Sequence, residues 1–335
     1  MLDIRVVVNY FGHPPQAFQL WLDSCGANGS INWMFFTDTD MSKYHVPDNV
    51  KIIFCDFDWM RQRICKSFAY PVKYSRPYDF CGFKPLIGTI FKNELEGADF
   101  WGWSDVDMLY GDLSPVVEMA KDGYDKVMPG GHFSIIRNSP ELNRFILGHQ
   151  CTKQALALEI EERDRLPCYD EVDFPLKVMN DYGARQESDI IPFVHLNPRC
   201  GHFKLDGCMS TRRLLDLNDG ETCPLVLTWC NGSLKGYFAL SNKTVRVLDL
   251  AYVHFFKRDI KDKIGRLEND GTEYLILPGG IDKVGNGNAF NMREYWNIRM
   301  LDFPRIHWQY FIKRLNWSTF KRKIGNFSMK RSLSS

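Results

Sequence analysis

Two aspartates separated by one residue, Asp105 and Asp107, follow the aromatic segment Asp99–Ser104. Carboxylates at positions i and i+2 can reach one ion where a chain leaves a strand and turns. Mg²⁺ and Mn²⁺ prefer such oxygen ligands and take few of them from the protein, because phosphates and water complete the shell. A cation held there stabilises the charge that builds on a departing diphosphate. The pair therefore predicts a divalent metal site, although a solvated acidic turn has the same pattern.

A histidine far along the chain is the candidate third ligand. His254 lies in the apolar run LAYVHFFKRD, and Lys257 follows three residues later. A neutral imidazole suits Mn²⁺, and a lysine ammonium supplies a point charge to a diphosphate. We therefore expect His254 to bind the metal and Lys257 to contact the diphosphate of a nucleotide-diphosphate donor. A core histidine beside a surface lysine is the alternative.

Three further segments could line the same site. Lys84 could contact the phosphates or the sugar of a donor, or lie on the surface at a helix start. Gly131 permits a close approach of the donor sugar, which His132 would face, unless the segment is only a tight turn. Asp170 and Glu171 could stabilise an oxocarbenium-like centre or act as a base on an acceptor hydroxyl. Acids are also favoured at a helix N-terminus without any catalytic role.

The elements that must position these residues alternate between strands and helices. Continuous apolar runs predict strands, and apolar residues at helical spacing predict helices between them. The predicted strands are Ile4–Asn9, Ile31–Thr37, Val50–Cys55 and Asp99–Ser104, and the predicted helices are Ala17–Ser24, Asp58–Phe68 and Phe83–Leu95. Such alternation predicts a parallel sheet with helices on both faces, where ligands bind beyond the carboxyl ends of the strands. Asn9, Tyr10 and Asp38 lie at such ends, and we expect them to contact the donor.

The second half of the chain adds shorter elements. Short strands are predicted at Lys126–Met128 and Phe133–Arg137, and a helix from the Ser139-Pro140-Glu141 start to about Gly148. Another helix is predicted to about Arg163. Residues 225–250 predict antiparallel hairpins with a turn at Asn231-Gly232. Residues 260–300 are rich in Gly, Asn and Asp and predict loops. The expected fold is α/β: a mostly parallel central sheet with flanking helices, then antiparallel hairpins and a basic helical tail.

Charge divides the chain into a body and a tail. The net charge is +1, but residues 304–335 hold eight Lys or Arg and no acid, which leaves −7 on residues 1–303. We take these ranges as a catalytic domain and a C-terminal tail. An acidic body argues against a nucleic-acid binder. The aromatic residues and cations of the tail predict peripheral contact with an anionic membrane. No apolar run reaches about 18 residues, the length that predicts a membrane-spanning helix.

The ten cysteines form no C-x-x-C pair, and the N-terminus shows no apolar export segment. We therefore expect reduced thiols in a cytoplasmic protein, peripheral on the cytoplasmic face of the inner membrane. Cys200, His202, Cys208 and Cys223 could bind zinc, but their spacing matches no standard zinc knuckle.

The segments FCGFKP, DFWGWSDVD, GGHFSIIRN and HFFKR, with Asp170-Glu171, resemble a bacterial family of GT-A glycosyltransferases from capsule and lipopolysaccharide gene clusters. The matching pieces run from Asn9 to Arg258. The chain is also distantly similar to retaining glycosyltransferases of family 8. In those, the D-x-D pair and a downstream histidine hold Mn²⁺, a following lysine meets the diphosphate, and an Asp-Gln pair lies near the anomeric carbon.

The resemblance implies the same metal ligands, Asp105, Asp107 and His254, and it makes Lys257 the diphosphate contact. It also places Asp170 and Glu171 nearest the anomeric carbon. The chain departs from family 8 at two points. Phe255-Phe256 stands where family 8 has a glycine between the histidine and the lysine, and Glu171 replaces a glutamine. Retention of configuration is therefore only an analogy.

We expect an Mn²⁺- or Mg²⁺-dependent enzyme that moves a sugar from a nucleotide-diphosphate donor, UDP foremost, to a growing cell-surface or lipid-linked glycan. One alternative is a metal-dependent nucleotidyl or phosphosugar transferase, and another is a non-catalytic glycan-binding protein. The sequence holds no G-x-S-x-G and no G-x-x-x-x-G-K-[ST], which disfavours a nucleophilic hydrolase and a P-loop kinase.

Overall fold

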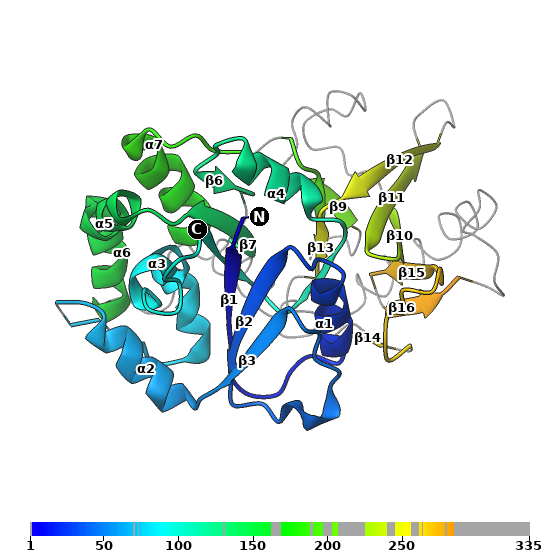
Figure 1. Cartoon of the computed structure of the whole chain (residues 1–335), viewed down its shortest axis with the longest axis horizontal. Coiled ribbons are helices and arrows are strands. Elements are labelled where there is room, and N and C mark those ends of the chain that lie inside the picture. Colours follow the sequence, from blue (N-terminus) through cyan, green and yellow to red (C-terminus); the bar gives the residue numbers. More distant parts are fainter. Residues whose placement is uncertain are drawn as a thin grey trace, which may run out of the picture.

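The computed structural model describes residues 2–69, 71–72, 74–129, 131–161, 169–187, 190–196, 203–206, 225–239, 245–255, 261–262, 264–278 and 280–284. Its central sheet has the strand order β3-β2-β1-β4-β7-β6. The strands are β1 (Ile4–Tyr10), β2 (Ile31–Thr37), β3 (Val50–Phe54), β4 (Phe100–Ser104), β6 (Lys126–Val127) and β7 (Phe133–Arg137). Strands β1 to β4 run parallel to one another, whereas β7 pairs antiparallel with both β4 and β6. The predicted mostly parallel sheet is confirmed (Figure 1).

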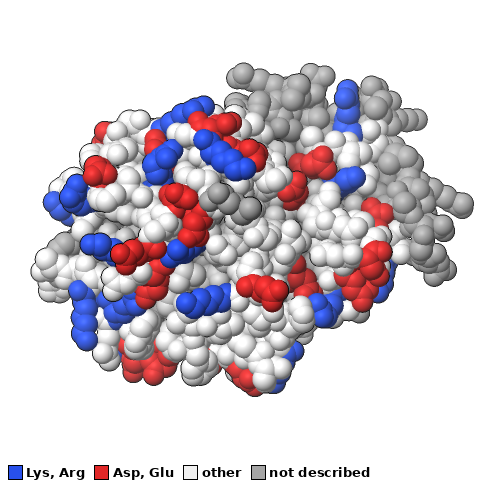
Figure 2. All heavy atoms as spheres, in the orientation of Figure 1, with Lys and Arg blue, Asp and Glu red and all other residues white. Residues whose placement is uncertain are grey.

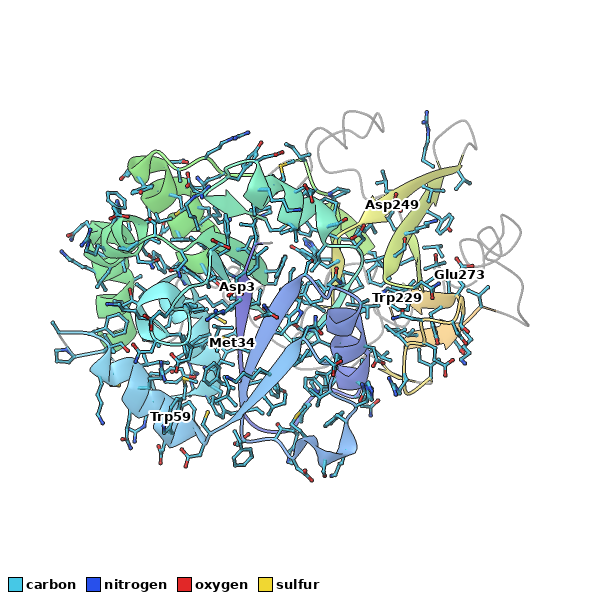
Figure 3. The ribbon with its side chains drawn as sticks, viewed as in Figure 1. Asp3, Met34, Trp59, Trp229, Asp249 and Glu273 are labelled. Carbon is cyan, nitrogen blue, oxygen red and sulfur yellow. The ribbon has the colours of Figure 1, made fainter. Side chains whose placement is uncertain are left out.

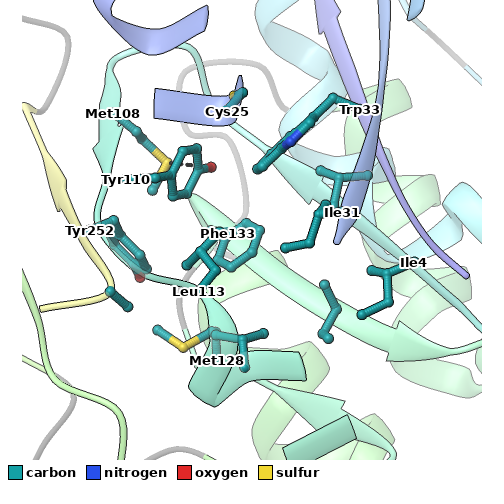
Figure 4. Packing of buried hydrophobic residues seen from close by; sticks show 14 of the residues in the cluster. Ile4, Cys25, Ile31, Trp33, Met108, Tyr110, Leu113, Met128, Phe133 and Tyr252 are labelled. Carbon is teal, nitrogen blue, oxygen red and sulfur yellow. Dashed lines mark hydrogen bonds between the residues drawn. The ribbon is translucent and has the colours of Figure 1, made fainter. Parts of the chain in front are cut away.

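Helices cover both faces of this sheet because alternate side chains of the buried strands point to opposite sides. Ile4, Val6 and Val8 of β1 pack in one core with α1 (Phe18–Gly26) and α4 (Ser114–Lys121), part of which is drawn in Figure 4. Val7 belongs to the core on the other face. Helices there are α2 (Phe57–Lys66), α3 (Ile87–Ile90), α5 (Pro140–Gly148), α6 (Gln150–Glu161) and α7 (Met179–Tyr182).

Two smaller sheets follow. The first has the order β5-β13-β8-β9, and the second has the order β12-β11-β10-β15-β16-β14. Their strands are β5 (Met108–Tyr110), β8 (Phe193–Leu196), β9 (Phe203–Asp206), β10 (Val226–Cys230), β11 (Ser233–Ala239), β12 (Val245–Leu250), β13 (Tyr252–His254), β14 (Lys261–Asp262), β15 (Tyr274–Leu277) and β16 (Gly280–Lys283). Trp229 of β10 donates from Nε1 to the carbonyl oxygen of Tyr110 at 2.9 Å, which ties the two sheets together (Figure 3).

Local signals in the sequence account for several boundaries. The hydroxyl of Ser139 accepts the N–H of Leu142 at 3.1 Å, which confirms the predicted start of α5. The β10–β11 hairpin turns at Asn231 and Gly232, with φ of 48° and 79°. Both values lie in the left-handed region that a two-residue hairpin of this type needs.

One expectation was wrong. The predicted helix Phe83–Leu95 is a 3₁₀ run, η2 (Pro77–Leu86), followed by the single turn α3 and further turns. Pro85 inside the run lacks the N–H that a continuous α-helix needs. Residues 260–300, expected to be dominated by loops, also contain the short strands β14, β15 and β16. A second 3₁₀ turn, η1, spans Met41–Lys43, and a wide-turned π-helix, η3, spans Tyr169–Val178.

Among the described residues, no helix is both long enough and apolar enough to cross a membrane. The six described cysteines are free thiols: Cys25, Cys55, Cys65, Cys81, Cys151 and Cys230. On the face drawn in Figure 2, Lys and Arg side chains are interspersed with Asp and Glu. The tail 304–335 and the four candidate zinc ligands lie outside the described residues, so the domain division and the tail's membrane contact stay predictions.

Candidate metal centre

The pairing of two short strands brings the predicted metal ligands together. Asp105 and Asp107 follow β4, and β5 begins at the next residue, Met108. Strand β5 pairs antiparallel with β13, so that His254 lies opposite Met108. The N–H of Phe255 donates to the carbonyl oxygen of Asp107 at 2.8 Å and extends this pairing by one bond. As a result, ligand atoms of Asp105, Asp107 and His254 all lie within 4.8 Å of one another.

The chemistry of this donor set fits a divalent cation. Nε2 of His254 lies 3.5 Å from Oδ1 of Asp107, and their side chains are only 10% and 14% exposed. Asp105 is more open, with 33% of its side chain exposed. Two carboxylates and one imidazole suit Mn²⁺ or Mg²⁺ and leave coordination positions for phosphate oxygens or water. The exposure of Asp105 gives a ligand access to the cluster.

Lys84 connects this cluster to a second carboxylate. Its side chain is 5% exposed, and Nζ lies 2.8 Å from Oδ1 of Asp105 and 3.7 Å from Oδ2 of Asp170. Nζ also donates to the carbonyl oxygen of Gly131 at 2.7 Å. Burial by itself favours the neutral amine, but the carboxylates of Asp105 and Asp170 outweigh it and raise the pKa of Lys84 above its usual value. Lys84 is therefore a buried cation shared by two acids.

Asp170 and Glu171 begin η3 and differ in environment. Asp170 is buried, whereas Glu171 is exposed. Burial raises the pKa of Asp170 to about 7, and the nearby Glu171 carboxylate adds to the effect, although Lys84 opposes it. A Cβ added at Gly131 would lie 2.4 Å from Cγ of Glu171 and 2.8 Å from Oδ2 of Asp170. Position 131 therefore has to be glycine for the turn to pass so close to the two acids. The preceding glycine, Gly130, lies outside the described residues.

His132 contacts both halves of the cluster. Its carbonyl oxygen accepts the N–H of Asp105 at 2.9 Å, and its ring centroid lies 4.4 Å from that of His254. Nδ1 is 3.1 Å from the hydroxyl of Tyr252, two residues before His254. Burial lowers the pKa of His132 well below its usual value, and the neighbouring His254 and Lys84 add to the effect. The imidazole is therefore neutral at pH 7.

Sequence reasoning missed His195, which lies opposite His254 where β8 runs parallel to β13. It contributes to the lowered pKa of His132, so three imidazoles gather beside the two aspartates. The similarity between the segments FVHL and YVHF, each a short strand with one histidine, is the signal that could have identified it.

Asn9, one of the predicted donor contacts, lies where the strand order reverses, between β1 and β4. The β1–β4 register pairs Val7 with Trp103, and two residues further along each strand come Asn9 and Asp105. Nδ2 of Asn9 donates to the hydroxyl of Tyr74 at 3.3 Å, and its buried Oδ1 has no hydrogen-bond donor among the described residues. Ligands of open α/β sheets bind at such a reversal.

Asp38 and Tyr10 make local contacts at the same edge. Oδ1 of Asp38 accepts the N–H of Gly12 at 2.8 Å, and the hydroxyl of Tyr10 donates to the carbonyl oxygen of His13 at 2.8 Å. The predicted diphosphate contact, Lys257, lies outside the described residues. The donor-binding roles of these residues stay predictions.

The chain belongs to the family described as "Family of unknown function (DUF6625)", whose model matches residues 6–284. No curated protein matches it in sequence.

Three solved structures are similar to this chain and superpose on it loosely. They are apo mouse xyloside xylosyltransferase 1 (TM-score 0.35, 10% identity, 55% of this chain and 83% of that one), a glycosyltransferase involved in glycosylation of the major capsid of PBCV-1 (0.31, 8%, 55% and 80%), and apo GlyE, a glycosyltransferase of Streptococcus pneumoniae TIGR4 (0.37, 11%, 94% and 64%).

Proposed function

We propose that this chain is a glycosyltransferase that takes a sugar from a nucleotide-diphosphate donor, UDP foremost, with the help of Mn²⁺ or Mg²⁺. The observation that carries the proposal is the convergence of Asp105, Asp107 and His254 within 4.8 Å. These three residues would hold the cation. When bound, the cation would neutralise the negative charge that develops on the diphosphate as the glycosidic bond breaks.

The buried pair of Lys84 and Asp170 supports this reaction over simple metal binding. A carboxylate 3.7 Å from a buried ammonium is held in place beside the metal cluster. In such a desolvated position its negative charge acts more strongly on a neighbouring cationic centre than it would in water. Asp170 would stabilise the positive charge of an oxocarbenium-like sugar.

Glu171 would act on the acceptor. It is exposed beside Gly131, so an incoming hydroxyl could reach it and lose a proton to it. Asn9, Tyr10 and Asp38 would contact the nucleotide at the strand reversal, while His132 and Gly131 would face the sugar. Lys257 would meet the diphosphate. The resemblance to glycosyltransferases of capsule and lipopolysaccharide clusters makes a cell-surface or lipid-linked glycan the proposed acceptor.

A donor screen tests the proposal. The protein is incubated with Mn²⁺ and a panel of nucleotide sugars, and free nucleoside diphosphate is measured with and without EDTA. We expect release from one donor class, abolished by EDTA and by Asp107→Ala. Release of pyrophosphate from a nucleoside triphosphate and a sugar phosphate would instead identify a nucleotidyltransferase. Binding of glycans with no need for metal or nucleotide would identify a non-catalytic protein.

A further inference from the structure

Lys126 and Glu187 are charged residues that lie buried outside the metal cluster. Lys126 and Glu187 are only 1% and 2% exposed. They lie side by side, because the N–H of Glu187 donates to the carbonyl oxygen of Lys126 at 2.8 Å. Burial lowers the pKa of Lys126 to about 7, against the opposing effect of the Glu187 carboxylate. A buried charged group is costly unless it is hydrogen-bonded, so both side chains need polar partners in the interior.

Both side chains hold Met128 in an unfavourable conformation. Met128 has a φ of 71°, a left-handed value that is unfavourable for a residue with a Cβ. Its side chain is fully buried in the core drawn in Figure 4. Its N–H donates to Oε2 of Glu187 at 3.3 Å. Its carbonyl oxygen accepts hydrogen bonds from Nζ of Lys126 and, at 2.8 Å, from the hydroxyl of Ser134.

Met128 begins the turn that supports the aspartate side of the metal centre. Three residues on, the carbonyl oxygen of Gly131 accepts a hydrogen bond from Lys84 at 2.7 Å. The next carbonyl, that of His132, accepts the N–H of Asp105 at 2.9 Å. Met128 therefore leads into the segment whose carbonyl groups contact Lys84 and Asp105.

The second carboxylate oxygen of Glu187 reaches the histidine side. Oε1 accepts the N–H of Ile190 at 2.6 Å and that of Ile191 at 3.2 Å. These residues lead into β8, which pairs through Val194 and His195 with β13, the strand that carries His254. One carboxylate thus bonds to the backbone on both sides of the metal centre.

We propose that Glu187, supported by Lys126, is a positioning residue that fixes the turn at 128–132 relative to β8 and so sets the separation of Asp105 from His254. The consequence for catalysis rests on the proposed function. Removing groups that orient metal ligands typically weakens metal binding about 10–100-fold.

Glu187→Gln tests the proposal because the amide keeps the shape of the side chain but replaces one acceptor oxygen with a donor. In the metal-free protein, we expect faster amide hydrogen exchange in residues 128–134 and 190–196, and not in β1 to β3. In calorimetric titration with Mn²⁺ alone, we expect the affinity to fall about tenfold. Unchanged exchange in both segments, or an equal increase throughout the chain, would overturn the proposal.

Glu94→Gln is the matched control. Glu94 pairs with Arg63 and precedes β4, at the opposite end of the parallel strands. The same substitution there should change neither Mn²⁺ affinity nor exchange in the two segments. If Glu187→Gln fails to fold because it leaves Lys126 buried without a counter-charge, Glu187→Gln with Lys126→Met replaces it. This double variant leaves no unpaired buried charge.

The exchange measurement needs neither metal nor sugar, which separates the two proposals. If the wild-type protein binds no Mn²⁺ but Glu187→Gln loosens both segments, the proposed function fails and the positioning role stands. If Mn²⁺ affinity is the same with and without Glu187, the positioning role fails and the proposed function stands.

Discussion

The ammonium of Lys84 lies 2.8 Å from a carboxylate oxygen of Asp105, so a buried lysine contacts one of the residues that would bind the metal. The same ammonium is 3.7 Å from Asp170. The ammonium of Lys84 therefore lies between the candidate metal ligand Asp105 and the candidate catalytic carboxylate of Asp170. Replacing Lys84 should therefore affect both the stability of the fold and catalysis.

Lys84→Met should lower the free energy of unfolding by about 3 kcal/mol, because removing one partner of a buried pair leaves the other charge uncompensated. Urea unfolding without metal measures the loss. Lys121→Met is the control, since Lys121 makes an exposed ion pair with Glu118 that should contribute less than about 1 kcal/mol. A Lys84→Met protein as stable as the wild type would contradict the structural role given to Lys84.

Gly131→Ala should reduce both stability and sugar transfer. The new Cβ would lie 2.4 Å from Cγ of Glu171, so the turn or the acid has to move. Overpacking of this kind costs about 1–3 kcal/mol. Adding Glu171→Ala should restore part of the stability but not the activity. Thermal unfolding and donor turnover measure the two effects, and a Gly131→Ala enzyme with wild-type turnover would refute the close approach.

The pH dependence of stability should report the ionisation of Asp170. Its pKa is raised to about 7 in the fold, from 3.8 in an unfolded chain. Between these values the folded state binds more protons. The contribution of Asp170 to the free energy of unfolding is therefore fully present below pH 4 and is lost as the pH rises through about 7. The slope for one group is at most about 1.4 kcal/mol per pH unit.

Asp170→Asn removes this titration. The difference in unfolding free energy between the metal-free wild type and the variant should fall from pH 4 to pH 7 and then level off. Chemical denaturation across that range measures it. A difference that does not vary with pH would show that Asp170 ionises normally.

Deleting residues 304–335 should release the protein from membranes. The segment combines eight cations with aromatic side chains, and each cation near an anionic leaflet contributes about 1 kcal/mol. Flotation with vesicles containing anionic lipid, compared with neutral vesicles, measures the effect. Equal binding of the truncated and full-length proteins would rule out the tail as the contact.

Local sequence signals predicted the framework because each acts over a few residues. Three such signals predicted elements that the structure contains. They are the apolar runs of β1 and β2, the Ser139 cap and the Asn231-Gly232 turn. The predicted helix Phe83–Leu95 was wrong for a local reason as well, since Pro85 interrupts it.

The site depends on contacts between distant segments, which such signals do not contain. Asp107 meets His254 because β5 pairs with β13, and β5 has only three residues. The burial of Lys84 follows from the packing of η2 against η3. Glu187 has no motif around it. Its proposed role rests on four hydrogen bonds that only the fold creates: its N–H donates to Lys126, and its carboxylate accepts from Met128, Ile190 and Ile191.

The central claim is that Asp105, Asp107 and His254 hold one cation for a nucleotide-sugar donor. The most direct test measures unfolding free energy with a panel of nucleotide sugars, with and without Mn²⁺. For the wild type, one donor should add about 2.7 kcal/mol at a hundred times its Kd, and only when Mn²⁺ is present. Asp107→Ala should abolish this gain without unfolding the protein. Equal stabilisation of the variant and the wild type would contradict the account.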